Sequence, residues 1–113
     1  AGVLHPALES FPGHALWKRD FKGASGVFSF LLPAADSPGA RSKAHAFLDA
    51  LQLFGLGWSW GGYESLAVHV NLSDRTIRKG PTNAAVIRLQ IGLEDVEDIL
   101  ADLERGFEAS AKV

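Results

Sequence analysis

A two-residue period in the apolar pattern predicts two strands, at residues 26–32 and 84–91. One face of each strand is expected to face a core, with apolar side chains at Phe28, Phe30, Leu32, Ile87, Leu89 and Ile91. The opposite face of the second strand carries Arg88 and Gln90, which makes that face partly polar. Residues 64–70 are apolar enough for a further strand or a short buried segment.

Two other stretches show the spacing of amphipathic helices. The first is expected to begin at Ser37, as the N-cap before Pro38, and to run to about Leu53, with Gly55 as its stop. Its apolar stripe consists of Ala44, Phe47, Leu48 and Leu51. The second helix is expected to begin near Leu93, with acidic residues in its first turns, where the helix dipole favours anions. Its apolar stripe consists of Val96, Ile99, Leu100, Leu103 and Phe107.

These elements predict an α+β fold, an α/β sandwich in which a small, mainly antiparallel sheet packs both long helices on one face. The other face, which carries Arg88, would be left for solvent or for a second domain. We further expect an extended segment at residues 3–8, a short helix at residues 14–19, and a surface loop from Asn71 to Asn83. That loop is long for a simple connector. A length of 113 residues corresponds to a single domain, residues 1–113.

The composition is that of an ordinary globular domain and argues against several classes of function. Apolar residues make up 47% of the chain and charged residues 21%. A formal net charge of −2 offers no basic surface for nucleic acid, and no apolar run approaches the roughly 20 residues of a membrane span. The absence of cysteine excludes disulfides and fits a reducing compartment such as the cytoplasm. The absence of methionine fits either a fragment of a longer protein or a removed initiator.

Arg88 is the strongest candidate for a binding residue. A charge in the middle of an apolar strand indicates either an exposed sheet face or a functional guanidinium, whose planar fork matches the two oxygens of a carboxylate. The stretch 59–66, with the sequence Ser-Trp-Gly-Gly-Tyr-Glu-Ser-Leu, is the second candidate. Its adjacent glycines suit either a rigid pocket loop or a simple turn beside a core tryptophan.

Other chemistries find little support in the sequence. The histidines at positions 5, 14, 45 and 69 do not have the spacing of metal ligands, so no metal site is expected. No phosphate-loop or dinucleotide-binding pattern occurs, and nothing local suggests a catalytic triad.

Four segments together are characteristic of one enzyme family. They are His5-Pro6-Ala7-Leu8, the segment from His14 to Gly26 around Trp17-Lys18-Arg19-Asp20-Phe21, the stretch 59–66, and Val86-Ile87-Arg88-Leu89-Gln90-Ile91-Gly92-Leu93-Glu94-Asp95. Over nearly its whole length the chain resembles the Cys/Met-metabolism transsulfuration enzymes, which depend on pyridoxal phosphate (PLP). The loop Asn71 to Asn83 is the one clear gap in the resemblance. The Ser-Trp-Gly-Gly-Tyr form of the glycine stretch is that of bacterial cystathionine β-lyases, whereas γ-acting relatives commonly have leucine in place of Trp60.

The resemblance implies a role for three residues. Arg88 would hold the α-carboxylate of the substrate, Ser59 would assist through its backbone or hydroxyl, and Trp60 would give the substrate pocket a flat apolar wall. The implied reaction is the β-elimination of cystathionine, which cleaves its C–S bond and yields homocysteine, pyruvate and ammonia in methionine biosynthesis.

The resemblance also implies that part of the enzyme lies outside this sequence. PLP chemistry needs a Schiff-base lysine, a phosphate site and an acid beside the pyridine nitrogen. The lysines at 18, 22, 43, 79 and 112 do not lie in the family's Schiff-base motif. We therefore expect the C-terminal domain of a cytoplasmic, homotetrameric enzyme whose N-terminal domain binds PLP. The fragment itself would contain no catalytic residue and would be inactive. The alternative is a freestanding α+β module, without PLP, that uses Arg88 to bind an amino acid or another carboxylate for regulation, or that serves assembly alone.

Overall fold

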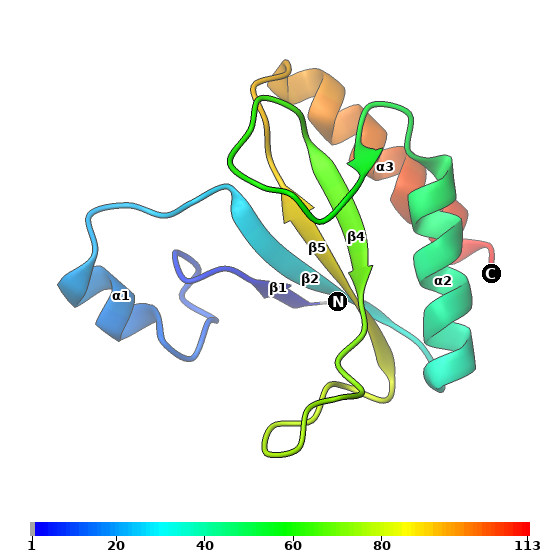
Figure 1. Cartoon of the computed structure of the whole chain (residues 1–113), viewed down its shortest axis with the longest axis horizontal. Coiled ribbons are helices and arrows are strands. Elements are labelled where there is room, and N and C mark those ends of the chain that lie inside the picture. Colours follow the sequence, from blue (N-terminus) through cyan, green and yellow to red (C-terminus); the bar gives the residue numbers. More distant parts are fainter. Residues whose placement is uncertain (1) are drawn as a thin grey trace.

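Five strands form one open sheet in the computed structural model, which describes residues 2–113 (Figure 1). In the sheet order β1-β2-β5-β4-β3, the strands are β1 (Gly2–Leu4), β2 (Val27–Pro33), β5 (Ala84–Gln90), β4 (Leu66–Val70) and β3 (Gly55–Leu56). Neighbouring strands run antiparallel except β3 and β4, which are parallel. Only Ala1 of the predicted domain 1–113 lies outside the described residues. The predicted α+β fold with a mainly antiparallel sheet is confirmed.

Three helices accompany the sheet: α1 (His14–Asp20), α2 (Ser37–Ala50) and α3 (Val96–Ala111). Figure 1 shows α2 and α3 side by side against the sheet, while α1 projects away at the other end of the molecule. The core fills the space between the sheet and these two helices, with buried side chains that include Phe30, Leu32, Ala44, Phe47, Ala67, Ile87, Leu89 and Ile99. The predicted inward faces of both strands are therefore confirmed, with Phe28 and Ile91 partly buried at the margin of this core.

The ends of α2 differ from the sequence prediction. Asp36, not Ser37, is the N-cap, because its carboxylate accepts the backbone N–H of Gly39 at 2.7 Å. The helix ends at Ala50 rather than near Leu53. The backbone beyond it bonds to a distant carboxylate instead, since the three N–H groups of residues 52–54 donate to Asp102 on α3. This contact is remote in sequence, and local patterns do not reveal it.

The start of α3 also differs from the prediction. The helix begins at Val96 rather than near Leu93, because Asp95 accepts the N–H groups of Glu97 and Asp98 and so caps it. The acidic first turn is confirmed.

The apolar stripe predicted for α3 is only partly correct. Of the five predicted residues, Ile99 is buried, Leu103 packs against the core, and the ring of Phe107, although 42% exposed, lies 5.3 and 5.1 Å from the core rings of Phe30 and Phe47. Val96 and Leu100 are exposed by 64% and 54%. The inward side of the helix also includes Asp102 and Gly106. A Cβ on Gly106 would lie 2.6 Å from the ring of Phe47, so this glycine lets α3 approach α2 closely. The contacts of Asp102 and Gly106 therefore help to set which side of α3 faces the core.

The sheet face that carries Arg88 is more covered than the sequence predicts. Val86 and Gln90 on this face are only 8% and 3% exposed. Gln90 bonds to the loop 57–65 near one end of β5, and Val86 lines a pocket together with the loop 71–83 near the other end. The loop from Asn71 to Asn83 contains no regular secondary structure, as predicted. The extended segment predicted for residues 3–8 is shorter, since β1 ends at Leu4. No helix within residues 2–113 has the length and apolar character needed to cross a bilayer.

Candidate functional site

Arg88 lies in the middle of β5, in register with Ser29 of β2 and Val68 of β4, and is half-buried. Its guanidinium donates a hydrogen bond from Nη2 to the backbone carbonyl of Trp58. The guanidinium carbon also lies 5.3 Å from the centroid of the Trp58 ring, within the range of a cation–π contact. The other N–H groups of the guanidinium have no hydrogen-bond acceptor within residues 2–113. Trp58 thus holds the guanidinium of Arg88 through one hydrogen bond and its ring, and the remaining N–H donors are free for a ligand.

Gln90 holds the glycine loop (residues 57–65) against β5. The residue is buried, and its amide Nε2 donates to the carbonyls of Gly62 and Ile91, each at 3.0 Å. Its Oε1 accepts the N–H of Gly61 at 3.1 Å. Gly61 has a φ of +82°, a conformation that disfavours residues with a Cβ. The side chain of Gln90 therefore fixes a turn that depends on glycine.

A second set of hydrogen bonds fixes the far end of the same loop. The Glu94 carboxylate accepts the N–H of Ser65 at 2.8 and 3.0 Å, and the Ser65 Oγ accepts the N–H of Gly92 at 2.9 Å. Leu93 N–H donates to the carbonyl of Tyr63 at 2.8 Å. A Cβ on Gly92 would lie 2.3 Å from that carbonyl oxygen, so only glycine allows this approach. The loop is thus attached to the segment that follows β5.

The structure places Ser59 and Trp60 on this loop, and within the described residues no hydrogen bond or cation–π contact joins either of them to Arg88. Ser59 is exposed, Trp60 is 68% exposed, and neither side chain makes a hydrogen bond within residues 2–113. Their predicted roles therefore remain predictions. The aromatic residue that contacts Arg88 is Trp58.

Sequence reasoning assigned no role to Trp58 or Gln90. Trp58 closes an apolar run, which is equally typical of a core segment. Gln90 was detectable, because it is a polar residue two positions after Arg88 and therefore shares its face of the strand.

The lysines do not suit a Schiff base beside Arg88. Lys43 lies on α2, across the sheet from Arg88, and donates to the carbonyl of Pro33 at 2.9 Å. The other four are exposed in α1, in loops or at the C-terminal end: Lys18, Lys22, Lys79 and Lys112. The described residues therefore do not fit PLP by themselves. Within the same residues, no three histidine or acidic side chains form a group that could hold a metal ion.

Comparison with protein families identifies the lineage. The model of the Cys/Met metabolism PLP-dependent enzyme family matches residues 1–108. The chain belongs to this family. Its members depend on PLP, so the cofactor inferred from the sequence is confirmed for the family as a whole.

Relatives of the chain include proteins named for β- and for γ-elimination of cystathionine. A Rhizobium johnstonii protein, provisionally named a cystathionine β-lyase, is 67% identical over 113 residues, covering 100% of this chain and 28% of its own length. The cystathionine β-lyase MetC of Escherichia coli is 44% identical over 112 residues, or 95% of this chain and 27% of MetC. A cystathionine γ-lyase of Mus musculus is 40% identical over 114 residues, or 96% of this chain and 27% of that enzyme.

The fold matches solved structures of the same family. A cystathionine γ-synthase from Xanthomonas oryzae pv. oryzae, crystallised with cystathionine, superposes with a TM-score of 0.77 at 33% identity. The match covers 99% of this chain and 29% of the synthase chain. The chain thus spans between a quarter and a third of the length of these relatives.

Proposed function

We propose that the chain is the C-terminal, substrate-binding domain of a cytoplasmic, PLP-dependent cystathionine β-lyase of methionine biosynthesis. The observation that carries the proposal is the state of Arg88. Its guanidinium is fixed by Trp58 on a rigid strand and keeps N–H donors free. A planar fork of this kind binds the two oxygens of an α-carboxylate in a defined orientation.

The glycine loop completes the proposed binding site. Arg88 holds the carboxylate of cystathionine, Ser59 adds a hydrogen bond from its backbone or hydroxyl, and the indole of Trp60 covers the side chain of the substrate. The exposure of Ser59 and Trp60 in this chain suits residues that meet a ligand. Fixing the carboxylate also fixes the direction of the Cα–H bond, which is the bond broken first in a β-elimination. Positioning of this kind can supply several kcal/mol of a barrier.

The remainder of the enzyme is proposed to come from an N-terminal domain of the same protein, which binds PLP, and from assembly as a homotetramer. Large exposed apolar side chains on this chain support its packing against another domain or subunit, since they occur in or next to α1 and around the glycine loop. They include Leu16, Phe21, Leu56, Trp58, Trp60, Tyr63 and Leu93.

A γ-acting enzyme is the second candidate. It is favoured by the 40% identity to a cystathionine γ-lyase and by the fold match to a γ-synthase. Trp60 favours the β-lyase, because γ-acting relatives commonly have leucine at that position of the glycine stretch.

Product analysis of the complete protein separates the candidates. We expect cystathionine to be converted to pyruvate and homocysteine, with 2-oxobutyrate as a minor product. Both oxo acids should be measured in one reaction, since pyruvate reports β-elimination and 2-oxobutyrate reports γ-elimination. A predominance of 2-oxobutyrate would establish the γ-acting candidate. The absence of both products would exclude both lyases.

A further inference from the structure

A broad pocket of about 710 Å³ opens between α2, the end of β4 and the loop 71–83. It lies near the start of β5, at the opposite end of that strand from Gln90. The pocket exists because β3 pairs only with Leu66 and Ala67, which leaves the edge of β4 beyond them without a neighbouring strand. Apolar residues, among them Ala40 and Val86, also line the pocket.

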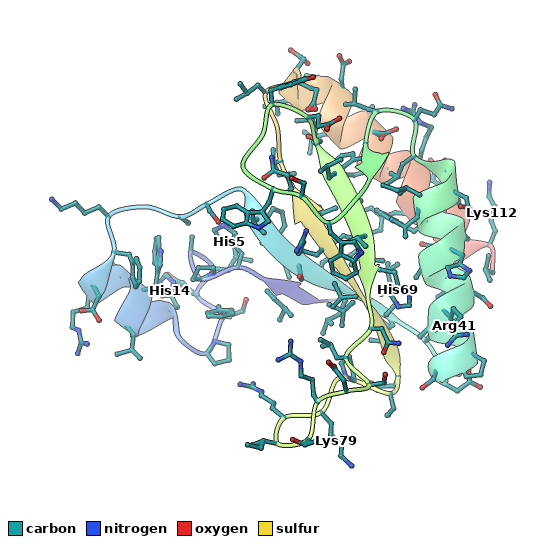
Figure 2. The ribbon with its side chains drawn as sticks, in the orientation of Figure 1. His5, His14, Arg41, His69, Lys79 and Lys112 are labelled. Carbon is teal, nitrogen blue, oxygen red and sulfur yellow. The ribbon has the colours of Figure 1, made fainter. Side chains whose placement is uncertain are left out.

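The walls of this pocket carry basic side chains from three separate elements. Arg41 and His45 come from α2, His69 comes from β4, and Arg75 and Lys79 come from the loop 71–83. Figure 2 shows Arg41 and His69 in the region where α2 faces β4, with Lys79 on the loop beyond them. No aspartate or glutamate lines the pocket, although the net charge of the whole chain is −2. The positive charge is therefore a local concentration, not a property of the surface in general.

Most of these basic groups have no internal partner. Within residues 2–113, Arg41 and Lys79 make no ion pair, whereas Arg75 lies 3.8 Å from the exposed carboxylate of Asp74. The rings of His45 and His69 lie 6.3 Å apart. Burial, with help from His45 and Arg41, lowers the pKa of the His69 imidazole. Mutual repulsion among these groups would be relieved by an anion bound between them.

We propose that this pocket binds a multiply charged, phosphate-type anion, either free or as the phosphate group of a metabolite. A guanidinium, an ammonium and two imidazoles can together donate to several oxygens of one tetrahedral anion. The side chains of Ser73, Thr82 and Asn71 also line the pocket and carry further N–H or O–H donors, whereas the Ser37 hydroxyl donates to the carbonyl of Thr82 at 3.2 Å. The loop 71–83 supplies about half of the lining, which gives this long segment a purpose beyond connecting β4 to β5.

Calorimetric titration of the complete, PLP-loaded protein with inorganic pyrophosphate tests the proposal. We expect one site per chain, and a loss of about tenfold in affinity for Arg41→Gln and for His45→Gln, since each removes one donor to the anion. Arg78→Gln is the matched control, because Arg78 neighbours Lys79 on the same loop but does not line the pocket. This control should bind within about twofold of wild type.

A titration with sulfate at two pH values tests the contribution of His69. Sulfate keeps its double charge between about pH 5.5 and 8, so a change in affinity reports on the protein and not on the anion. The charged or titratable groups that act on His69 are His45 and Arg41 from α2, and Arg75 and Lys79 line the same pocket from the loop 71–83. Sulfate should therefore bind more tightly at about pH 5.5 than at about pH 8, because a protonated His69 adds a positive charge to the pocket. The proposal is overturned if pyrophosphate does not bind, if Arg41→Gln binds like wild type, if Arg78→Gln loses as much affinity, or if sulfate binding does not change with pH.

Discussion

Trp58 and Trp60 belong to the same loop, yet their surroundings give them different roles. Trp58 accepts the Arg88 hydrogen bond through its carbonyl and offers its ring to the guanidinium, whereas Trp60 is 68% exposed. Neither role follows from the sequence alone, because both tryptophans stand beside glycines in an apolar context. The glycine turn between Trp60 and Tyr63 was predictable, and Gly61 does adopt positive φ.

Replacing Trp60 by leucine in the complete enzyme should weaken the handling of cystathionine without unfolding the loop. The exposed indole contributes little to the fold, but its flat face is proposed to cover the substrate. We expect kcat/KM to fall about three- to tenfold, the value of one aromatic contact, and 2-oxobutyrate to gain relative to pyruvate. Tyr63→Leu is the control, because Tyr63 is an aromatic residue of the same loop that is 78% exposed, and it should change kcat/KM less. Wild-type kcat/KM and product ratio in Trp60→Leu would remove the indole from the substrate pocket.

Replacing Gln90 by leucine should loosen the loop that carries Ser59 and Trp60. The change removes the bonds to Gly61, Gly62 and Ile91 while leaving a side chain of similar size. We expect KM for cystathionine to rise about tenfold, with a loss of roughly 1–3 kcal/mol in stability from the unpaired backbone groups. Steady-state kinetics and thermal unfolding measure the two effects. A loss of stability with unchanged kinetics would show that Gln90 supports only the fold.

At the scale of elements, α3 shows where sequence patterns stop being sufficient. Its position along the chain and its acidic start follow from local residues, but the side that it buries is set by contacts with distant ones. Asp102 is fully buried and accepts the N–H groups of residues 52–54 at 2.8–2.9 Å, and the guanidinium of Arg105 at 2.8 Å. A pattern of apolar residues cannot identify a buried carboxylate, so the predicted stripe omitted Asp102 and included the exposed Val96 and Leu100.

Asp102→Asn should destabilise the chain by about 3 kcal/mol, because an amide offers one acceptor oxygen and no charge to these donors. Burial alone would raise the pKa of the Asp102 carboxyl, but the backbone donors and Arg105 outweigh it and hold the pKa below its ordinary value. The stabilisation is therefore complete above the unfolded-state pKa of about 3.9 and is lost as the pH falls through the lower folded-state pKa.

Denaturant unfolding of wild type and Asp102→Asn at a series of pH values checks this prediction. The difference between the two proteins should be constant near neutral pH and should shrink below about pH 4. Glu104→Gln, an exposed carboxylate change on the same helix, should leave stability within about 0.5 kcal/mol. A difference that stays the same down to acid pH would contradict a charged Asp102 in the folded chain.

At the scale of the whole molecule, the sequence predicted the sheet, the helices on one face and the Arg88 strand. It did not predict that loops would cover both ends of β5, because those contacts join residues far apart in the chain. The proposal that this chain binds the substrate while another domain binds PLP rests on the positions of all five lysines. The lysines are scattered over exposed positions and α2, and none is placed for a Schiff base beside Arg88.

The isolated chain should therefore release no pyruvate from cystathionine and should form no specific adduct with PLP. Incubation with PLP, reduction with borohydride and peptide mapping would locate any lysine that had formed a Schiff base. A single modified lysine together with pyruvate release would overturn the proposed division. Scattered, substoichiometric labelling of exposed lysines without pyruvate is the expected result.

The most direct test of the account is the kcat/KM of Arg88→Ala in the complete enzyme. Arg88 is half-buried on the face opposite the core, so the variant should remain folded by circular dichroism and thermal unfolding. Loss of the charge-assisted bonds to the carboxylate should cost roughly 2–4 kcal/mol, or about 30- to 1,000-fold in kcat/KM with cystathionine. Arg88→Lys keeps the charge but not the planar guanidinium, so its kcat/KM should fall between those of wild type and Arg88→Ala. A folded Arg88→Ala enzyme with wild-type kcat/KM would contradict the assignment of Arg88 to the substrate carboxylate.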